Sequence, residues 1–227
     1  MTQTQTPRSQ WVPVALSKMI EAGTSAGTAV NGAEIVVWRD TAGAAHAWED
    51  RCPHRGMKMS FGFVRGDHIT CLYHGWEYDT SGTCRYVPAH PELEVPKSIC
   101  ISRYGTAEAG GMIWAYTPLG TTEQDPPPVL PALEGVRSVY MDASVARVSD
   151  TLQQHSSAPA GDDAALCNAI TLTLENTVVS IGLQQISDGQ CALHIAVPEG
   201  TAPETKEALL DWSEDLRRTV EGLEAAA

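Results

Sequence analysis

The sequence lacks any apolar run near the roughly 20 residues that a membrane-spanning helix needs. Its start, MTQTQTPRSQ, also lacks the basic and then apolar profile of a secretion signal. Positive charge is scarce, because 15 Lys and Arg stand against 28 Asp and Glu, for a net charge of -13. Nucleic acids and anionic membranes bind clustered cations, so neither is expected as a partner. The expected compartment is the cytoplasm.

The charge is divided unevenly along the 227 residues. Residues 1–118 hold 10 basic and 11 acidic side chains, a net of -1, whereas residues 119–227 hold 5 and 17, a net of -12. Five prolines crowd the segment TPLGTTEQDPPPVLP at this boundary, and proline favours extended chain over helix or central strand. We therefore expect a domain at 1–118, a linker at 119–131 and a second domain at 132–227.

Short β-rich runs fill the first of these domains. EIVVWRD (34–40), HITCLY (68–73) and GMIWAY (111–116) are separated by Gly, Asp and Pro turn signals, and only a helical turn is expected, near residues 17–22. The fold class expected for residues 1–118 is therefore mainly β, with antiparallel sheets.

The second domain is expected to be a small α+β unit. SVYMDASVARV (138–148), NAITLTLENTVVSIGLQQI (168–186) and CALHIAV (191–197) predict an antiparallel sheet, and SDTLQQHSSAPAGDDAA (149–165) predicts a mobile loop. In residues 203–227 an apolar stripe recurs every three or four positions, which predicts a terminal amphipathic helix packed across the sheet.

Two cysteine and histidine pairs carry the clearest chemistry: Cys52-x-His54 and, after sixteen residues, Cys71-x2-His74. Zinc fingers usually pair cysteine with cysteine and histidine with histidine, whereas here each loop supplies one of each. This interleaving suits a 2Fe-2S cluster with two thiolates on one iron and two imidazoles on the other. A structural zinc site and unrelated core residues are the alternatives.

The run from Trp11 to Pro88 resembles the Rieske domain of the ring-hydroxylating and demethylating oxygenases. It contains their C-x-H-R-G, G-x-V, C-x-Y-H-G-W and G-x-C-x-x-x-P pattern almost continuously, with Leu72 where a proline is common. The resemblance implies that Cys52, His54, Cys71 and His74 bind a Rieske-type 2Fe-2S cluster. No residue is assigned a catalytic role.

The loops differ from those of the respiratory Rieske proteins, in which extra cysteines form a disulfide and a serine follows the second His-Gly. Met57, Tyr73 and Trp76 stand at those positions here. Fewer hydroxyl donors to the sulfurs and no disulfide imply a low reduction potential, near the bottom of the roughly -150 to +300 mV Rieske range.

The neighbours of the ligands have weaker interpretations. Four cations lie close to the ligands in the sequence: Arg51, Arg55, Lys58 and Arg65. They could form a basic rim that binds an acidic redox partner, or equally an ordinary solvated surface. Four aromatic side chains are expected to pack the loops: Tyr73, Trp76, Tyr78 and Tyr86. The other cysteines are expected to be small buried hydrophobes: Cys84, Cys100, Cys167 and Cys191.

A second iron site is missing from the pattern. Oxygenases of this family hold a mononuclear iron with a D/E-x2-H-x3-5-H motif, and no pair among the five remaining histidines has that spacing. His155 lacks a companion histidine, and His194 is expected to be an ordinary strand histidine with a hydrogen-bond partner. QCALHIAVPEGTAPETKEALLDW nevertheless resembles the end of an oxygenase catalytic domain, so residues 132–227 resemble a shortened one without mononuclear iron.

The leading hypothesis is an electron-transfer subunit of an oxygenase system, which is not catalytic alone. A reductase or ferredoxin would donate electrons, and a catalytic oxygenase subunit, docked on an edge strand or on the terminal helix, would accept them in an oligomer. The alternatives are a complete mono- or dioxygenase with an atypical iron site that uses His155, His194 and a distant Asp, and a non-catalytic redox sensor. The sequence identifies neither the substrate nor the donor.

Overall fold

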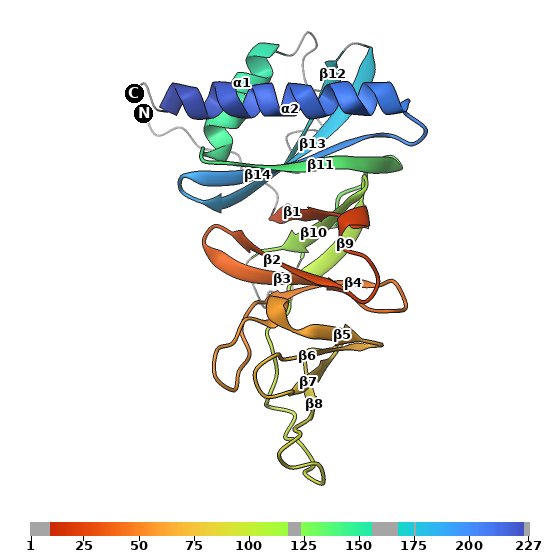
Figure 1. Ribbon diagram of the computed structural model, residues 1–227, viewed down its shortest axis with the longest axis vertical. Helices are drawn as coiled ribbons and strands as arrows, with labels where there is room; N and C mark the ends of the chain where they lie inside the picture. The colour runs from red at the N-terminus through yellow and green to blue at the C-terminus, as the bar shows by residue number, and fades with distance from the viewer. Residues whose placement is uncertain (1–9, 118–123, 156–167, 175, 225–227) are drawn as a thin grey trace.

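The computed structural model describes residues 10–117, 124–155, 168–174 and 176–224. Four antiparallel sheets lie one after another along its longest axis, with both α-helices at one end and the long loop after β8 at the other (Figure 1). The expected fold class, a mainly β first half followed by a sheet with a terminal helix, is confirmed.

The first half contains three sheets. One has the order β1-β10-β9, the second β2-β3-β4, and the third β5-β6-β7-β8. The strands are β1 (Trp11–Leu16), β2 (Ser25–Val30), β3 (Ala33–Arg39), β4 (Ala45–Glu49), β5 (Phe63–Arg65), β6 (His68–Thr70), β7 (Glu77–Asp79), β8 (Cys84–Tyr86), β9 (Gly105–Ala109) and β10 (Met112–Tyr116). The expected helical turn is a 3-10 turn at Ser17–Met19, and a second one lies at Met59–Phe61.

Strand β3 is buried on both faces, which explains its continuous apolar run. Ile35 and Val37 pack into the core shared with β1 and β10, whereas Val36 and Trp38 pack toward the sheet β5-β8. The two-residue turn before β3 is Asn31-Gly32, and both residues have positive φ, 50° and 81°, as a tight hairpin turn requires. The middle sheet thus lies between its two neighbours. The first cysteine and histidine loop follows its strand β4, and the second connects β6 and β7 of the third sheet.

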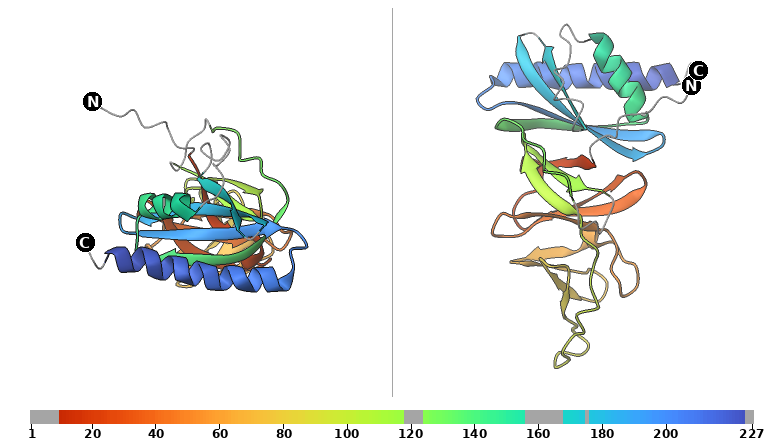
Figure 2. Two further views of the ribbon diagram at one scale, coloured as in Figure 1. Left: turned by 90° about the horizontal axis from the view of Figure 1, so that it is seen from above. Right: turned by 180° about the vertical axis from the view of Figure 1, so that it is seen from behind.

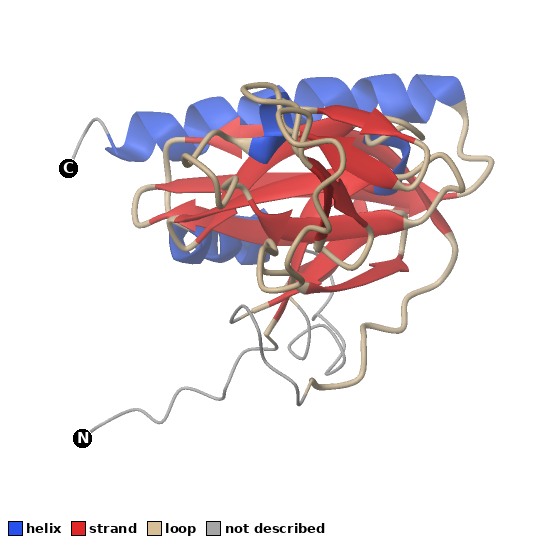
Figure 3. Ribbon diagram, turned by 90° about the horizontal axis from the view of Figure 1, so that it is seen from below, coloured by secondary structure: helices blue, strands red, loops and turns tan. Residues whose placement is uncertain are grey.

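The second half is a four-stranded sheet of order β11-β14-β13-β12. Its elements are β11 (Leu133–Met141), α1 (Val145–His155), β12 (Ala169–Leu174), β13 (Thr177–Ser187), β14 (Gln190–Pro198) and α2 (Pro203–Glu224). Both helices cover one face of the sheet, and strand and helix side chains make a common core there (Figures 2 and 3). Neither described helix combines the length and the apolarity that crossing a membrane requires.

The structure corrects one part of the prediction for this half. Residues Val145–His155 form helix α1, although 145–148 were expected to continue a strand and 149–155 to belong to a loop. Ser144 caps the helix, because its Oγ accepts a hydrogen bond from the Arg147 amide at 3.3 Å. Val145, Val148 and Leu152 then fall on one buried face. The rest of the predicted loop, 156–165, lies outside the described residues.

The other face of this sheet packs on the first half. Trp114 and Met112 from β10 share a core with Ala169 and Ala196. Gly182 in β13 lies at the closest approach, since a Cβ there would come within 2.6 Å of the Met112 Sδ and 2.9 Å of the Pro13 ring. The turn between β2 and β3 also bonds to this sheet, because the amides of Asn31 and Gly32 donate to carbonyls at the end of β13.

Candidate metal centre

Two loops with matching backbone geometry carry the predicted ligands. In the first, the Gly56 amide donates to the Cys52 carbonyl at 2.8 Å, and in the second, the Gly75 amide donates to the Cys71 carbonyl at 3.0 Å. Both glycines have positive φ, 72° and 69°, a conformation that side chains with a Cβ rarely adopt. The glycine four residues after each cysteine is therefore the sequence signal for this shared turn.

The loops bring all four predicted ligand side chains together, with different exposure. Cys52 and Cys71 are buried at 2% exposure each, whereas His54 is half-buried and His74 is exposed. The two imidazole rings lie 4.6 Å apart between centroids, at an interplanar angle of 62°. The thiols therefore lie inside the protein, and the imidazoles lie at its surface.

Each imidazole contacts an aromatic ring from the second loop. Trp76 stacks on His54 with centroids 4.3 Å apart and the planes within 4°, and Tyr73 lies 4.0 Å from His74 at 33°. Trp76 and the buried Tyr78 pack the loops as expected. Tyr73 and Tyr86 differ from that expectation, because 58% and 37% of their surfaces are exposed.

The buried thiols are electrostatically unequal. A hydrogen bond from Cys71 lowers the pKa of Cys52 below that of an ordinary thiol, against the opposing effect of burial, and Tyr78 adds a further hydrogen bond, with its hydroxyl oxygen 3.2 Å from the Cys52 Sγ. The pKa of Cys71 is raised, because its proton is held against Cys52 and because the site is buried. A thiolate is thus already favoured at Cys52, and thiolate is the form that binds metals.

This donor set fits a 2Fe-2S cluster better than a single ion. Within the described residues, no three His, Cys, Asp or Glu side chains converge on one ion position. A Rieske cluster needs only two pairs, a thiolate pair on one iron and an imidazole pair on the other. Structural zinc sites instead place four side chains around one ion.

Other candidate residues lie away from this site. His194 is fully buried in β14, where its Nδ1 is 2.8 Å from the Ser138 Oγ and its Nε2 is 2.9 Å from the Gln184 Oε1. This matches the expected strand histidine. His155 is the last residue of α1.

The remaining described cysteines differ in exposure. Cys84 and Cys191 are buried, as expected. Cys100 is exposed, so the prediction was wrong for this residue. Its backbone forms an isolated antiparallel β-bridge with Thr83. Cys167 lies outside the described residues.

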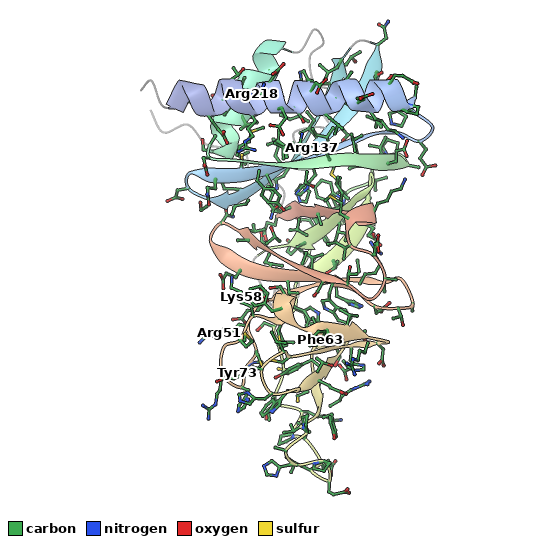
Figure 4. All side chains as sticks on the ribbon, viewed as in Figure 1. Arg51, Lys58, Phe63, Tyr73, Arg137 and Arg218 are labelled. Carbon is green, nitrogen blue, oxygen red and sulfur yellow. The ribbon has the colours of Figure 1, made fainter. Side chains whose placement is uncertain are left out.

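The four predicted rim cations are not equivalent. Lys58 forms an ion pair with Glu34 at 2.6 Å. Arg51, Arg55 and Arg65 are exposed and form no ion pair with any residue that the structure describes. Figure 4 shows Arg51, Lys58 and Tyr73 along the same side of the lower half of the molecule.

Comparison with known proteins agrees with the motif. Residues 10–97 match the family described as the Rieske [2Fe-2S] domain. The chain is 30% identical over 201 residues to oxidoreductase NdmD of Pseudomonas putida, and the aligned region covers 85% of this chain and 34% of that protein. It is 36% identical over 129 residues to the 3-chlorobenzoate-3,4-dioxygenase oxygenase subunit of Comamonas testosteroni, covering 56% and 29%. The chain thus spans about a third of the length of these relatives.

The fold is also similar to that of a solved protein. Apo dicamba monooxygenase superposes with a TM-score of 0.79, at 18% sequence identity, over 96% of this chain and 87% of that chain. At this identity the likeness concerns the fold alone. It extends beyond the residues of the matched domain and includes the second half of the chain.

Proposed function

The chain belongs to the Rieske oxygenase family, and on that premise we propose that it is the electron-transfer component of an oxygenase system. In this proposal Cys52 and Cys71 bind one iron of the 2Fe-2S cluster, and His54 and His74 bind the other. When bound, the cluster supplies reversible one-electron transfer.

The observation that supports this role is the contrast between buried thiols and surface imidazoles. The cysteines sit in the core with Met59, Ile69 and Tyr78, which keeps water away from the sulfur side. His74 is exposed. A partner protein that touches this edge would therefore be separated from an iron by little more than one imidazole ring.

The acceptor is proposed to be a mononuclear iron on a catalytic subunit, and the donor a reductase or ferredoxin. Of the two docking elements that the sequence suggested, α2 buries its apolar face, Leu209, Leu216 and Val220, against the sheet of its own chain. An edge strand of this sheet is the better candidate, since the outer edges of β11 and β12 pair with no strand among the described residues. The resulting assembly would be a hetero-oligomer, in which this chain is not catalytic alone.

The second candidate, a complete oxygenase with an atypical iron site, is less well supported. His194 has both ring nitrogens occupied, by Ser138 and Gln184, and it is fully buried. It would have to break this network to bind a metal. The third candidate, a redox sensor, would keep the cluster but transfer no electrons to an oxygenase.

Iron analysis combined with oxygen uptake tests the proposal. The purified chain is expected to contain two irons and to show the absorption and electron paramagnetic resonance of a Rieske centre. Oxygen uptake is expected only after a catalytic subunit, co-purified from the native host, is added. Three irons per chain, with substrate-dependent oxygen uptake by the chain alone, would instead establish the complete oxygenase. A cluster that reduces no oxygenase, but changes partner binding on oxidation, would establish the sensor.

A further inference from the structure

The histidines and two aromatic side chains form a continuous row of four rings. Trp76 stacks on His54, His54 meets His74 edge to face, and His74 lies against Tyr73, with centroid distances of 4.3, 4.6 and 4.0 Å. Trp76 is partly buried, but Tyr73 at the other end is 58% exposed. Tyr73 therefore covers part of the His74 ring while much of its own ring meets solvent.

Leu72 adds a second apolar side chain beside this ring. It is 48% exposed and directly precedes Tyr73 at the tip of the second loop. Phe61, Phe63 and Leu93 of the same half are also exposed, at 60%, 51% and 50%, but Leu72 and Tyr73 directly precede a proposed ligand, His74. An exposed aromatic ring and an aliphatic neighbour at the most exposed ligand are the features of a protein contact site.

Unpaired positive charge gathers in the same half of the molecule. The described cations that form no ion pair all fall between residues 51 and 103, and they are Arg51, Arg55, Arg65, Lys97 and Arg103. Arg55 follows the ligand His54 directly. The Nε of Arg51 lies 3.5 Å from the position that a Cβ on Gly56 would take, so its side chain lies over the same loop.

We propose that Leu72 and Tyr73 are the contact point for the redox partner, and that Arg51 and Arg55 select a partner with carboxylates around an apolar spot. This inference rests on the proposed electron-transfer function and adds the surface and the chemistry of the partner. A partner side chain packed on Tyr73 would lie one ring away from His74. The unpaired arginines would attract an acidic partner and orient it, and this attraction weakens with salt.

The test compares a protein reductant with a small one. Stopped-flow absorbance follows reduction of the holoprotein by a reduced plant-type ferredoxin, which is an acidic 2Fe-2S protein, and separately by dithionite. Tyr73→Ala is expected to lower the second-order rate constant with ferredoxin about thirtyfold, the lower limit for an aromatic hot spot. Tyr73→Phe keeps the ring and is expected to retain the rate. The rate with dithionite is expected to fall much less than the rate with ferredoxin, and voltammetry of each variant separates a change in driving force from the loss of the contact.

Two further variants separate this surface from general effects. Tyr86→Ala removes another exposed tyrosine of the same half, 37% exposed, and is expected to react like the wild type. Arg55→Glu is expected to lower the rate with ferredoxin and to flatten its dependence on salt.

The outcomes distinguish this surface from the function on which it rests. If ferredoxin reduces the wild type and Tyr73→Ala equally fast, or if Tyr86→Ala loses as much as Tyr73→Ala, the contact point is wrong and the electron-transfer function stands. If dithionite reduces the wild type but ferredoxin does not, the inferred acidic partner is wrong. The iron and oxygen measurements then decide the function independently.

Discussion

Tyr78 shows how a single buried side chain changes the expectation for the whole site. The low potential was expected because Trp76, and not a serine, follows the second His-Gly. Two residues later, however, the Tyr78 hydroxyl lies 3.2 Å from the Cys52 Sγ. Trp76 directly precedes β7, and Tyr78 is the middle residue of this strand. Because side chains alternate between the two faces of a strand, residues two apart lie on the same face, so the position of Trp76 could have indicated that Tyr78 also points toward the loops. The site therefore has one hydroxyl donor to sulfur that the sequence interpretation missed.

Removing this donor should lower the reduction potential. Reduction adds negative charge, which a hydrogen bond to the thiolate stabilises, so Tyr78→Phe is expected to favour the oxidised form. A net hydrogen bond of about 1 kcal/mol corresponds to roughly 40 mV for one electron. Voltammetry of the two holoproteins measures the shift. Tyr104→Phe, at a buried tyrosine of a separate core, should leave the potential unchanged; an equal shift there, or none in Tyr78→Phe, would contradict the argument.

The proposed ligands make a second prediction at this scale. His74→Cys should keep a cluster but lower its potential, because thiolate replaces neutral imidazole and adds negative charge at the exposed iron. Cys52→Ala should abolish the cluster, since it removes one of the two proposed thiolate ligands. Iron content, absorbance and potential distinguish the two results. A Rieske spectrum in Cys52→Ala would refute the ligand assignment.

Among the elements, strands were easier to predict than helix α1, for a physical reason. Runs such as Ile35–Trp38 are apolar over a strand's length and lie between turn residues, so local pattern and tertiary burial agree. Helix α1 begins with β-branched Val145 and continues through polar residues, and its identity depends on the Ser144 cap and on packing against β13 and α2. The two loop motifs predicted the site, but its aromatic row depends on ring orientations that spacing does not specify.

The connection between the 3-10 turn Met59–Phe61 and β5 offers a test of packing near the site. Gly62 has an ordinary φ of -79°, yet a Cβ there would lie 2.4 Å from the Thr70 carbonyl oxygen, one residue before Cys71. Gly62→Ala should therefore displace backbone, lower the free energy of unfolding by about 2 to 3 kcal/mol and reduce iron content.

Gly32→Ala is the matched control for that substitution. Gly32 has φ +81° and no atom within 4 Å of the position that a Cβ would take, so alanine there would cost about 1 to 2 kcal/mol of backbone strain without any clash. Urea unfolding gives both free energies, and iron analysis gives cluster retention. Equal losses of stability with full iron in both variants would show that the contact with Thr70 is unimportant.

At the scale of the whole molecule, a buried polar network joins the two halves. His194 in β14 bonds to Ser138 and Gln184, and the Gln184 Nε2 donates to the Thr28 Oγ1 at 2.7 Å and to the Ala29 carbonyl at 2.8 Å, both in β2. The sequence indicated His194 as a satisfied strand histidine, but the bond from its partner Gln184 to Thr28, 156 residues away, cannot be inferred from local pattern. The stacked sheets therefore share a polar link as well as an apolar core.

This network makes the stability of the protein sensitive to mild acid. Burial lowers the pKa of His194 from 6.5 to about 4, so the folded protein keeps the ring neutral where the unfolded chain binds a proton. Because the unfolded state binds more protons in this window, the free energy of unfolding falls as pH falls from about 6.5 toward 4, by at most about 1.4 kcal/mol per pH unit.

Urea unfolding across that window, in the wild type and in His194→Gln, isolates this contribution. Glutamine is neutral throughout and is able to bond to Ser138 and Gln184, so the variant should lose most of the slope above about pH 4.5. Paired carboxylates such as Glu108 and Glu214 also have lowered pKa values, so their stabilisation is lost as pH falls from about 5 downward, but equally in both proteins. The difference between the two curves therefore reports His194 alone. If the curves stay parallel from neutral pH downward, the histidine is not the group that couples protonation to the junction of the two halves.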